Sequence, residues 1–166
     1  MANDNVVAPE AARNAACANA HPLLHLYARL LTQLDAAINH EHRLLRCDGR
    51  DPRTDDHVRS AEVAWTRLAR MADLVIRLSG NAPALHAGAG LVRSAVAHRD
   101  AVGAPTVFAG LVGSARTLEQ AQGESPVAPL LSVTCQLLMR AAVLEGAEPS
   151  GPTPHFPDSA GACPDI

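Results

Sequence analysis

The chain has 166 residues, a formal net charge of −3 and 48% hydrophobic residues, many of them alanine. This length suits one domain with its own core. A net negative charge gives the chain as a whole no electrostatic attraction for nucleic acid or for an anionic membrane. The aromatic residues that favour sheets make up only 2% of the chain. We therefore expect an all-α bundle of four to five helices built on a long antiparallel αα-hairpin, with a disordered N-terminal arm and C-terminal tail.

The first 20 residues are polar and alanine-rich, and we interpret them as a flexible arm that is frayed or partly helical. They show neither the positive region nor the apolar region of a secretory signal. The cysteines are scattered, without a CxxC pair, so we expect free thiols in a reducing compartment. No window is apolar for long enough to cross a bilayer. The expected location is the cytoplasm, with no membrane partner. The four cysteines are Cys17, Cys47, Cys135 and Cys163.

Two long amphipathic patterns follow the arm. His21-Pro22 predicts a helix start, because proline is tolerated in a first turn, and the helix should run to Cys47 with one leucine-rich face. The stretch from Asp55 to Gly80 places its apolar residues on about half of a helical wheel and its charges on the other half. The short connection DGRDPRTDD between them predicts the antiparallel hairpin.

The rest of the chain predicts shorter helices. Breaks at Gly103-Ala104-Pro105 and at Gly123-Glu124-Ser125-Pro126 separate helices over 83–101, 105–122 and 129–144. The last of these is apolar nearly all round, which predicts burial in the bundle or in an oligomer interface. The bundle domain should thus cover 21–146. The segment 147–166 is rich in Pro, Gly and Ser, so it is expected to be a disordered tail.

Histidines in the first long helix raise the question of a metal site. His21 and His25 have the i, i+4 spacing by which two imidazoles can share a metal, whereas His40 and His42 point apart on a helix. No cysteine or carboxylate is spaced to complete the ligand set. We expect exposed histidines and neither a metal nor another cofactor.

Glu41 is the least expected residue on the apolar face of its helix, because a buried, unpaired carboxylate costs several kcal/mol. Three interpretations compete: Glu41 reaches solvent near the mouth of the hairpin, it pairs with an arginine, or it is an acid with a raised pKa in a pocket. The first is favoured over the second, and the second over the third.

All 14 basic residues are arginines, and Arg59, Arg70 and Arg77 lie within about 20° of one another on the helical wheel. This line could contact phosphates. Asp73, however, has the spacing to pair with both Arg70 and Arg77, and Glu62 adds another negative charge nearby. We expect a solvated, salt-bridged face.

The segment 91–118 has the outline of a helix-turn-helix, with a glycine-containing turn between two apolar helices. A recognition helix needs polar or basic side chains at its exposed first turns. Here the exposed face has Thr106, Ala109, Gly110, Gly113 and Thr117, with Arg116 as its only cation. Small residues more simply allow another helix to pack closely.

No nucleophile motif or nucleotide-binding fingerprint is present, so we expect no enzyme. The favoured function is a non-enzymatic helical interaction or assembly protein that self-associates, or binds another protein, through helix faces. The alternative is a small DNA-binding regulator using residues 91–118, which makes nucleic acid the less favoured partner. The candidate residues are Glu41, Arg59, Arg70, Arg77, Gly110 and Gly113.

Overall fold

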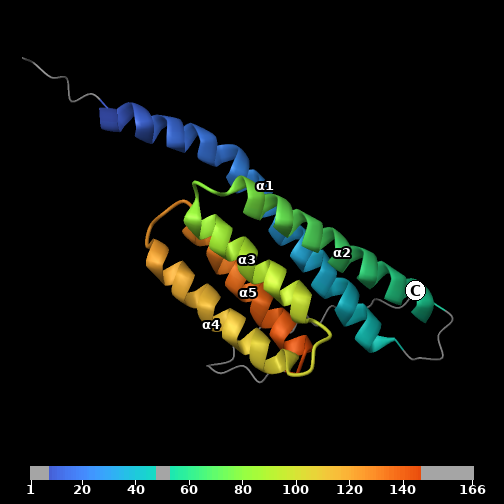
Figure 1. The fold of residues 1–166 in the computed structure, drawn as a ribbon. Helices are drawn as coiled ribbons and strands as arrows, with labels where there is room; N and C mark the ends of the chain where they lie inside the picture. The colour runs from blue at the N-terminus through green and yellow to red at the C-terminus, as the bar shows by residue number, and fades with distance from the viewer. Residues whose placement is uncertain (1–7, 48–52, 147–166) are drawn as a thin grey trace, which may run out of the picture.

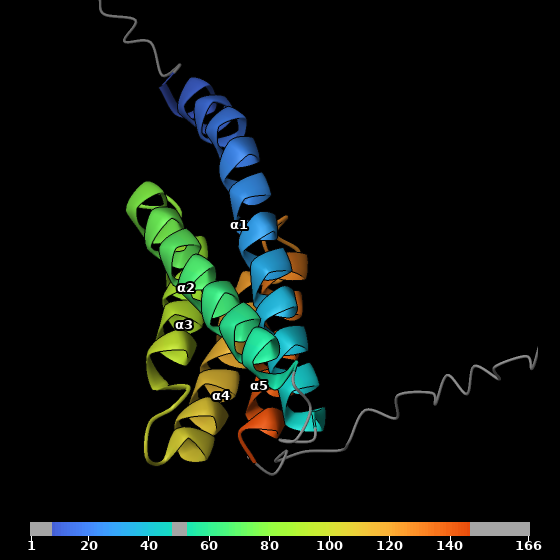
Figure 2. The ribbon, with the colours of Figure 1, turned by 90° about the vertical axis from the view of Figure 1, so that its right-hand side faces the viewer.

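A computed structural model describes residues 8–47 and 53–146, and for residues 8–21 it describes the backbone path alone. Within these ranges the chain forms helices and no strand (Figures 1 and 2), which confirms the all-α bundle. The expected tail, 147–166, and the first seven residues of the expected arm lie outside the described residues. The helices are α1 (Ala8–Arg46), α2 (Thr54–Leu78), α3 (Pro83–His98), α4 (Ala104–Gln122) and α5 (Ala128–Leu144).

The helices pack in two groups. α1 and α2 lie side by side and run in opposite directions, and α3, α4 and α5 pack beneath them (Figures 1 and 2). α5 contacts α1, α3 and α4, so it is enclosed by the bundle. This position explains its apolar sequence: most of its large side chains face neighbouring helices. None of the described helices is long and apolar enough to span a bilayer.

One continuous hydrophobic core draws side chains from all of the described helices. The apolar face predicted for α1 supplies Tyr27 and several leucines, and the face predicted for α2 lies opposite. Leu45, Val58 and Leu78 are exposed, although their helical positions predict a core location, because they lie near helix ends where the core stops. The fully buried large side chains are Tyr27, Leu30, Leu34, Ile38, Leu68, Val75, Leu85, Val92, Phe108, Leu131, Thr134 and Leu138.

The centre of the bundle contains one polar contact. The hydroxyl of Thr134 donates to the backbone carbonyl of Leu130 at 2.8 Å, and the Tyr27 hydroxyl lies 2.9 Å from the Thr134 oxygen. Gly88 lies directly over this pair: a Cβ there would lie 2.2 Å from the Tyr27 oxygen. The hydrogen bonds satisfy hydroxyls that would be costly to bury alone, and glycine lets α3 approach α1.

α1 begins earlier than the sequence pattern predicted. It starts at Ala8 and passes through Pro22, which lies inside the helix instead of in its first turn. The alanine-rich stretch before the proline favours helix, and no glycine or proline interrupts it between Pro9 and Pro22. The first part of α1 extends beyond the bundle in both views (Figures 1 and 2).

Candidate interaction surface

Glu41 belongs to a cluster at the end of the bundle where α1, α2 and the turn after α3 meet. The indole N–H of Trp65 donates to Glu41 Oε2 at 2.9 Å, and the guanidinium of Arg99 lies 3.8 Å from the same oxygen. Arg99 also stacks over the Trp65 ring, with its Cζ 5.4 Å from the ring centroid. Of the three interpretations of Glu41, this geometry matches the pairing with an arginine.

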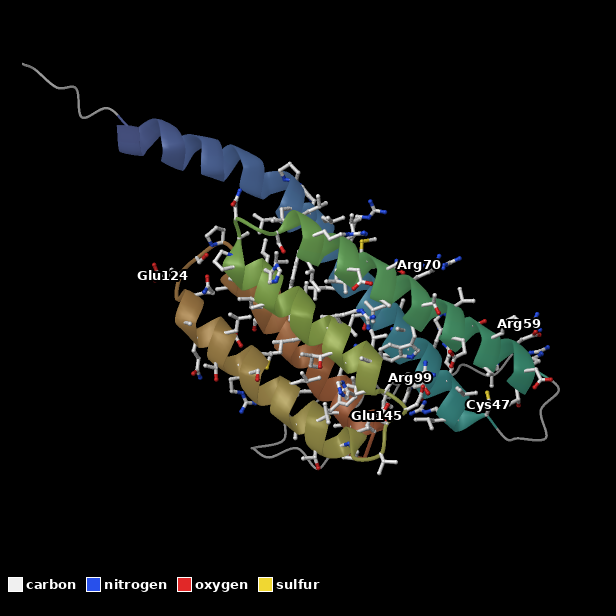
Figure 3. The ribbon with its side chains drawn as sticks, viewed as in Figure 1. Cys47, Arg59, Arg70, Arg99, Glu124 and Glu145 are labelled. Carbon is white, nitrogen blue, oxygen red and sulfur yellow. The ribbon has the colours of Figure 1, made fainter. Side chains whose placement is uncertain are left out.

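Arg99 is the central charge of this cluster, because it also pairs with Glu62 and, at 3.0 Å, with Asp100. Burial lowers the pKa of Arg99, but hydrogen bonds to Asp100 and Glu62 outweigh that effect, so the pKa lies above its usual value. Glu145, at the end of α5, lies near Arg99 (Figure 3). Burial raises the pKa of Glu145, and the negative charges of Glu41 and Asp100 raise it further.

The ionic cluster consists of Glu41, Glu62, Trp65, Arg99 and Asp100. Arg99 contacts the other four side chains, and the Trp65 indole also donates to Glu41. Among the described residues, no buried side-chain nitrogen or oxygen lacks a hydrogen-bond partner. The contacts of the cluster tie α1 and α2 to the turn after α3.

Arg59, Arg70 and Arg77 lie on the exposed side of α2, and Figure 3 shows the first two pointing away from the bundle. The prediction that Asp73 would pair with Arg70 and Arg77 is wrong. Asp73 instead accepts a hydrogen bond from Arg93 of α3 at 3.0 Å. The two acidic side chains expected to neutralise the arginine line pair with other arginines instead. Asp73 pairs with Arg93 of α3, and Glu62 pairs with Arg99 just after α3. The line keeps its positive charge toward solvent.

Gly110 and Gly113 lie together in a groove between α3 and α4. The groove has a volume of about 610 Å³, and none of its lining residues is charged. The Ser114 and Thr117 hydroxyls on its wall donate to the carbonyls of Gly110 and Gly113, each at 3.0 Å. Because these donors are used within α4, the wall presents mainly methyl, methylene and Cα groups. The lining residues are Ala87, Leu91, Gly110, Gly113, Ser114, Thr117, Leu118 and Ala121.

The packing of the bundle does not require glycine at Gly110 or Gly113. A Cβ added at Gly110 or Gly113 meets nothing within 4 Å, and neither residue has a positive φ. Gly88 differs, because its Cβ would collide with Tyr27. A glycine in a helix costs about 1 kcal/mol relative to alanine. α4 therefore carries two destabilising residues, side by side on an exposed and uncharged face, that its own packing does not require.

The histidines considered for metal binding lie outside the groove, whereas the segment considered for DNA binding, 91–118, forms much of its wall. No group of three or more His, Cys, Asp or Glu in the described part of the chain is arranged to hold a metal; the side chain of His21 lies outside that part. α3 and α4 run alongside each other in opposite directions (Figure 1), whereas the helices of a helix-turn-helix cross at about 90–120°. Arg93 and Arg99 are held in ion pairs with Asp73 and with the ionic cluster.

Two sets of residues were missed by sequence reasoning. The partner of Glu41 is Arg99, which comes immediately after the α3 helix. Its position in the sequence does not show that it meets Glu41, because the contact depends on how the helices pack. The α3 wall of the groove, Ala87 and Leu91, was also missed. The sequence signal for this wall was a set of small residues at helical spacing, on the face of α3 opposite Leu85 and Val92.

Comparison with known proteins gives no relative on which to base a function. No family model, no curated protein and no solved structure matches this chain.

Proposed function

We propose that this protein is a non-enzymatic helical assembly protein that associates with itself through the groove between α3 and α4. The observation that carries the proposal is the pair of helical glycines, Gly110 and Gly113, which have open space where a side chain would stand. Close packing of a partner helix is a physical reason for glycine at such a site, since a side chain would hold the two backbones apart.

The chemistry of the groove agrees with a helical partner. Its lining has no charged group to desolvate, and the Ser114 and Thr117 hydroxyls already have acceptors within α4. Burying this surface would leave no polar group without a partner, so the hydrophobic gain would not be offset by lost hydrogen bonds. We assign the protein to the cytoplasm, where Cys47 and the buried Cys135 would remain free thiols.

The test is to fill the groove without harming the fold. Exchanging Gly110 and Gly113 together for alanine should raise the stability of the monomer by about 1–2 kcal/mol, because alanine favours helix. The same exchange should weaken self-association, measured by sedimentation velocity or by light scattering after size-exclusion chromatography. Gly90→Ala is the matched control: Gly90 is also helical with nothing within 4 Å of a Cβ, but it does not line the groove.

The wild-type chain should form oligomers that dissociate on dilution, and Gly90→Ala should form them equally well. A wild-type protein that remains monomeric at its highest accessible concentration would refute self-association. Oligomers that the double alanine exchange leaves unchanged would refute the groove as the interface.

A further inference from the structure

The shape of the groove restricts what can fill it. It is an open hollow between two helices, which one side of a helix can fill. The occupant must be a helix whose side is not already committed to its own bundle. Among the described helices, α3, α4 and α5 contribute residues to the core along their length, and the first two turns of α2, which do not, carry the charges of Asp55, Asp56 and Arg59.

The first part of α1 is the exception. The helix starts at Ala8, but Figures 1 and 2 show that it meets the bundle only further along. A helical stretch of about a dozen residues is only marginally stable alone in water. This projecting stretch, residues 8–20, would gain stability by packing against an apolar surface.

The sequence of residues 8–20 suits a groove lined by glycine and alanine. At helical spacing six of its seven alanines fall within about 160° of the wheel, with the uncharged Asn19 among them, whereas Glu10, Arg13, Asn14 and Ala20 fall on the other side. Alanine has the smallest side chain that still favours helix, so an alanine-rich side allows the closest approach to Gly110 and Gly113. Neither the groove lining nor the alanine side includes a charge. The clustered alanines are Ala8, Ala11, Ala12, Ala15, Ala16 and Ala18.

The projecting stretch cannot occupy the groove of its own chain. α1 is one helix of 39 residues, with Pro22 inside it at the point where it leaves the bundle. It packs on α2, α3 and α5 but not on α4, and its first part points away from α4 in both views (Figures 1 and 2). The occupant therefore has to come from another molecule.

From these constraints we propose that residues 8–20 of a second copy lie in the α3–α4 groove, with their alanine side against Gly110 and Gly113. This inference rests on the proposed self-association and adds the identity of the segment that fills the groove. The arm of one copy and the groove of the next form the contact.

The experiment compares two full-length variants with equal added charge. Ala12→Glu/Ala15→Glu changes the alanine side, and Asn14→Glu/Cys17→Glu changes the opposite side. Glutamate is a good helix former, so both should retain the helix, which circular dichroism checks. The first variant should self-associate at least about tenfold more weakly than wild type, because glutamate would enter an uncharged contact. The second should associate within about twofold of wild type.

Mixing tests the contact directly. Gly113→Leu fills the groove but keeps the arm, and Ala12→Glu/Ala15→Glu changes the arm but keeps the groove. Each variant alone should be defective in association. A mixture of the two should associate again, because the intact arm of one can enter the intact groove of the other.

The outcomes separate the two proposals. If wild type associates and Gly113→Leu does not, but the arm variant associates normally, another segment fills the groove; the arm proposal is then overturned and self-association stands. Equal loss in both glutamate variants, or no recovery on mixing, also overturns the arm proposal. A wild-type chain that never associates overturns both proposals.

Discussion

At the scale of single residues, two glycines of α3 have opposite environments although they are only two positions apart. A Cβ at Gly88 would lie 2.2 Å from the Tyr27 hydroxyl oxygen and 3.0 Å from a Leu131 methyl group, whereas a Cβ at Gly90 meets nothing within 4 Å. The first glycine is required by close packing, and the second only lowers the helix propensity of α3.

This contrast predicts opposite effects of the same substitution. Gly88→Ala should destabilise the protein by about 1–3 kcal/mol, because the added methyl group pushes α3 from α1 and strains the Tyr27–Thr134 hydrogen bond. Gly90→Ala should raise stability by up to about 1 kcal/mol through helix propensity alone.

Urea unfolding of the two variants, followed by circular dichroism, measures both effects. If both variants changed the free energy of unfolding equally, the close approach of α3 to Tyr27 would not explain the effect of a substitution at Gly88.

Sequence reasoning reached some residues of the candidate surface and not others, for a physical reason. Gly110 and Gly113 were identifiable, because the exposed side of α4 follows from helical periodicity within that helix alone. Arg99 as the partner of Glu41 was not, because the pairing depends on which helix ends meet in space. Asp73 was assigned to arginines of its own helix, since i, i+4 spacing is visible in sequence and a contact with Arg93 of α3 is not.

At the scale of helices, Arg99 joins elements that are far apart in the chain. Its side chain is only 10% exposed, and it contacts Glu41 of α1 together with Glu62 and Trp65 of α2. The second arginine of this region, Arg93, joins α2 and α3 through Asp73, but that pair is open to solvent, with exposed fractions of 40% and 49%.

We therefore expect Arg99→Gln to lower the free energy of unfolding by about 1–3 kcal/mol, because Glu41 would keep its half-buried position without a cation beside it. Arg93→Gln should cost no more than about 1 kcal/mol, as exposed pairs do.

Thermal unfolding of both variants at low and at high salt provides the measurement. The cost of Arg99→Gln should persist in salt, because the partly buried pair is screened less than an exposed one. Equal costs for the two arginines would contradict a tying role for Arg99.

The helices themselves were largely predictable, because the apolar periodicity of α1 and α2 and the breaks around Gly103 and Gly123 are local signals. The start of α1 was not. Pro22 has the same appearance in a sequence whether it opens a helix or lies within one, and the alanines before it bury too little to produce an apolar stripe.

At the scale of the whole molecule, Tyr27 links folding to alkaline pH. It is the single tyrosine of the chain, and burial raises its pKa to about 12, although the hydrogen bond with Thr134 acts in the opposite direction. The unfolded chain releases this proton near its ordinary pKa of about 10, whereas the folded protein retains it until about pH 12. The raised pKa means that ionisation favours the unfolded state.

Stability should therefore be unaffected by this group below pH 10 and should fall by about 2–3 kcal/mol between pH 10 and 12. Denaturant unfolding across this range measures the loss, and ultraviolet absorbance reports ionisation of the same side chain. Tyr27→Phe should remove that part of the pH dependence. A tyrosine that ionises near pH 10 in the still-folded protein would contradict its burial.

The uninterrupted passage of α1 from the bundle into the arm affects the symmetry of any assembly that it builds. A contact between an arm and a groove joins two different surfaces. Two copies can exchange arms across a twofold axis, or the contact can repeat head to tail and close into a ring or continue as a filament. Pro22 lies inside the helix where it leaves the bundle, and a proline there removes a helix hydrogen bond and bends the helix. The direction that α1 takes after this point sets the rotation from one copy to the next. The angle at which a single helix leaves its bundle would then determine whether the assembly is finite.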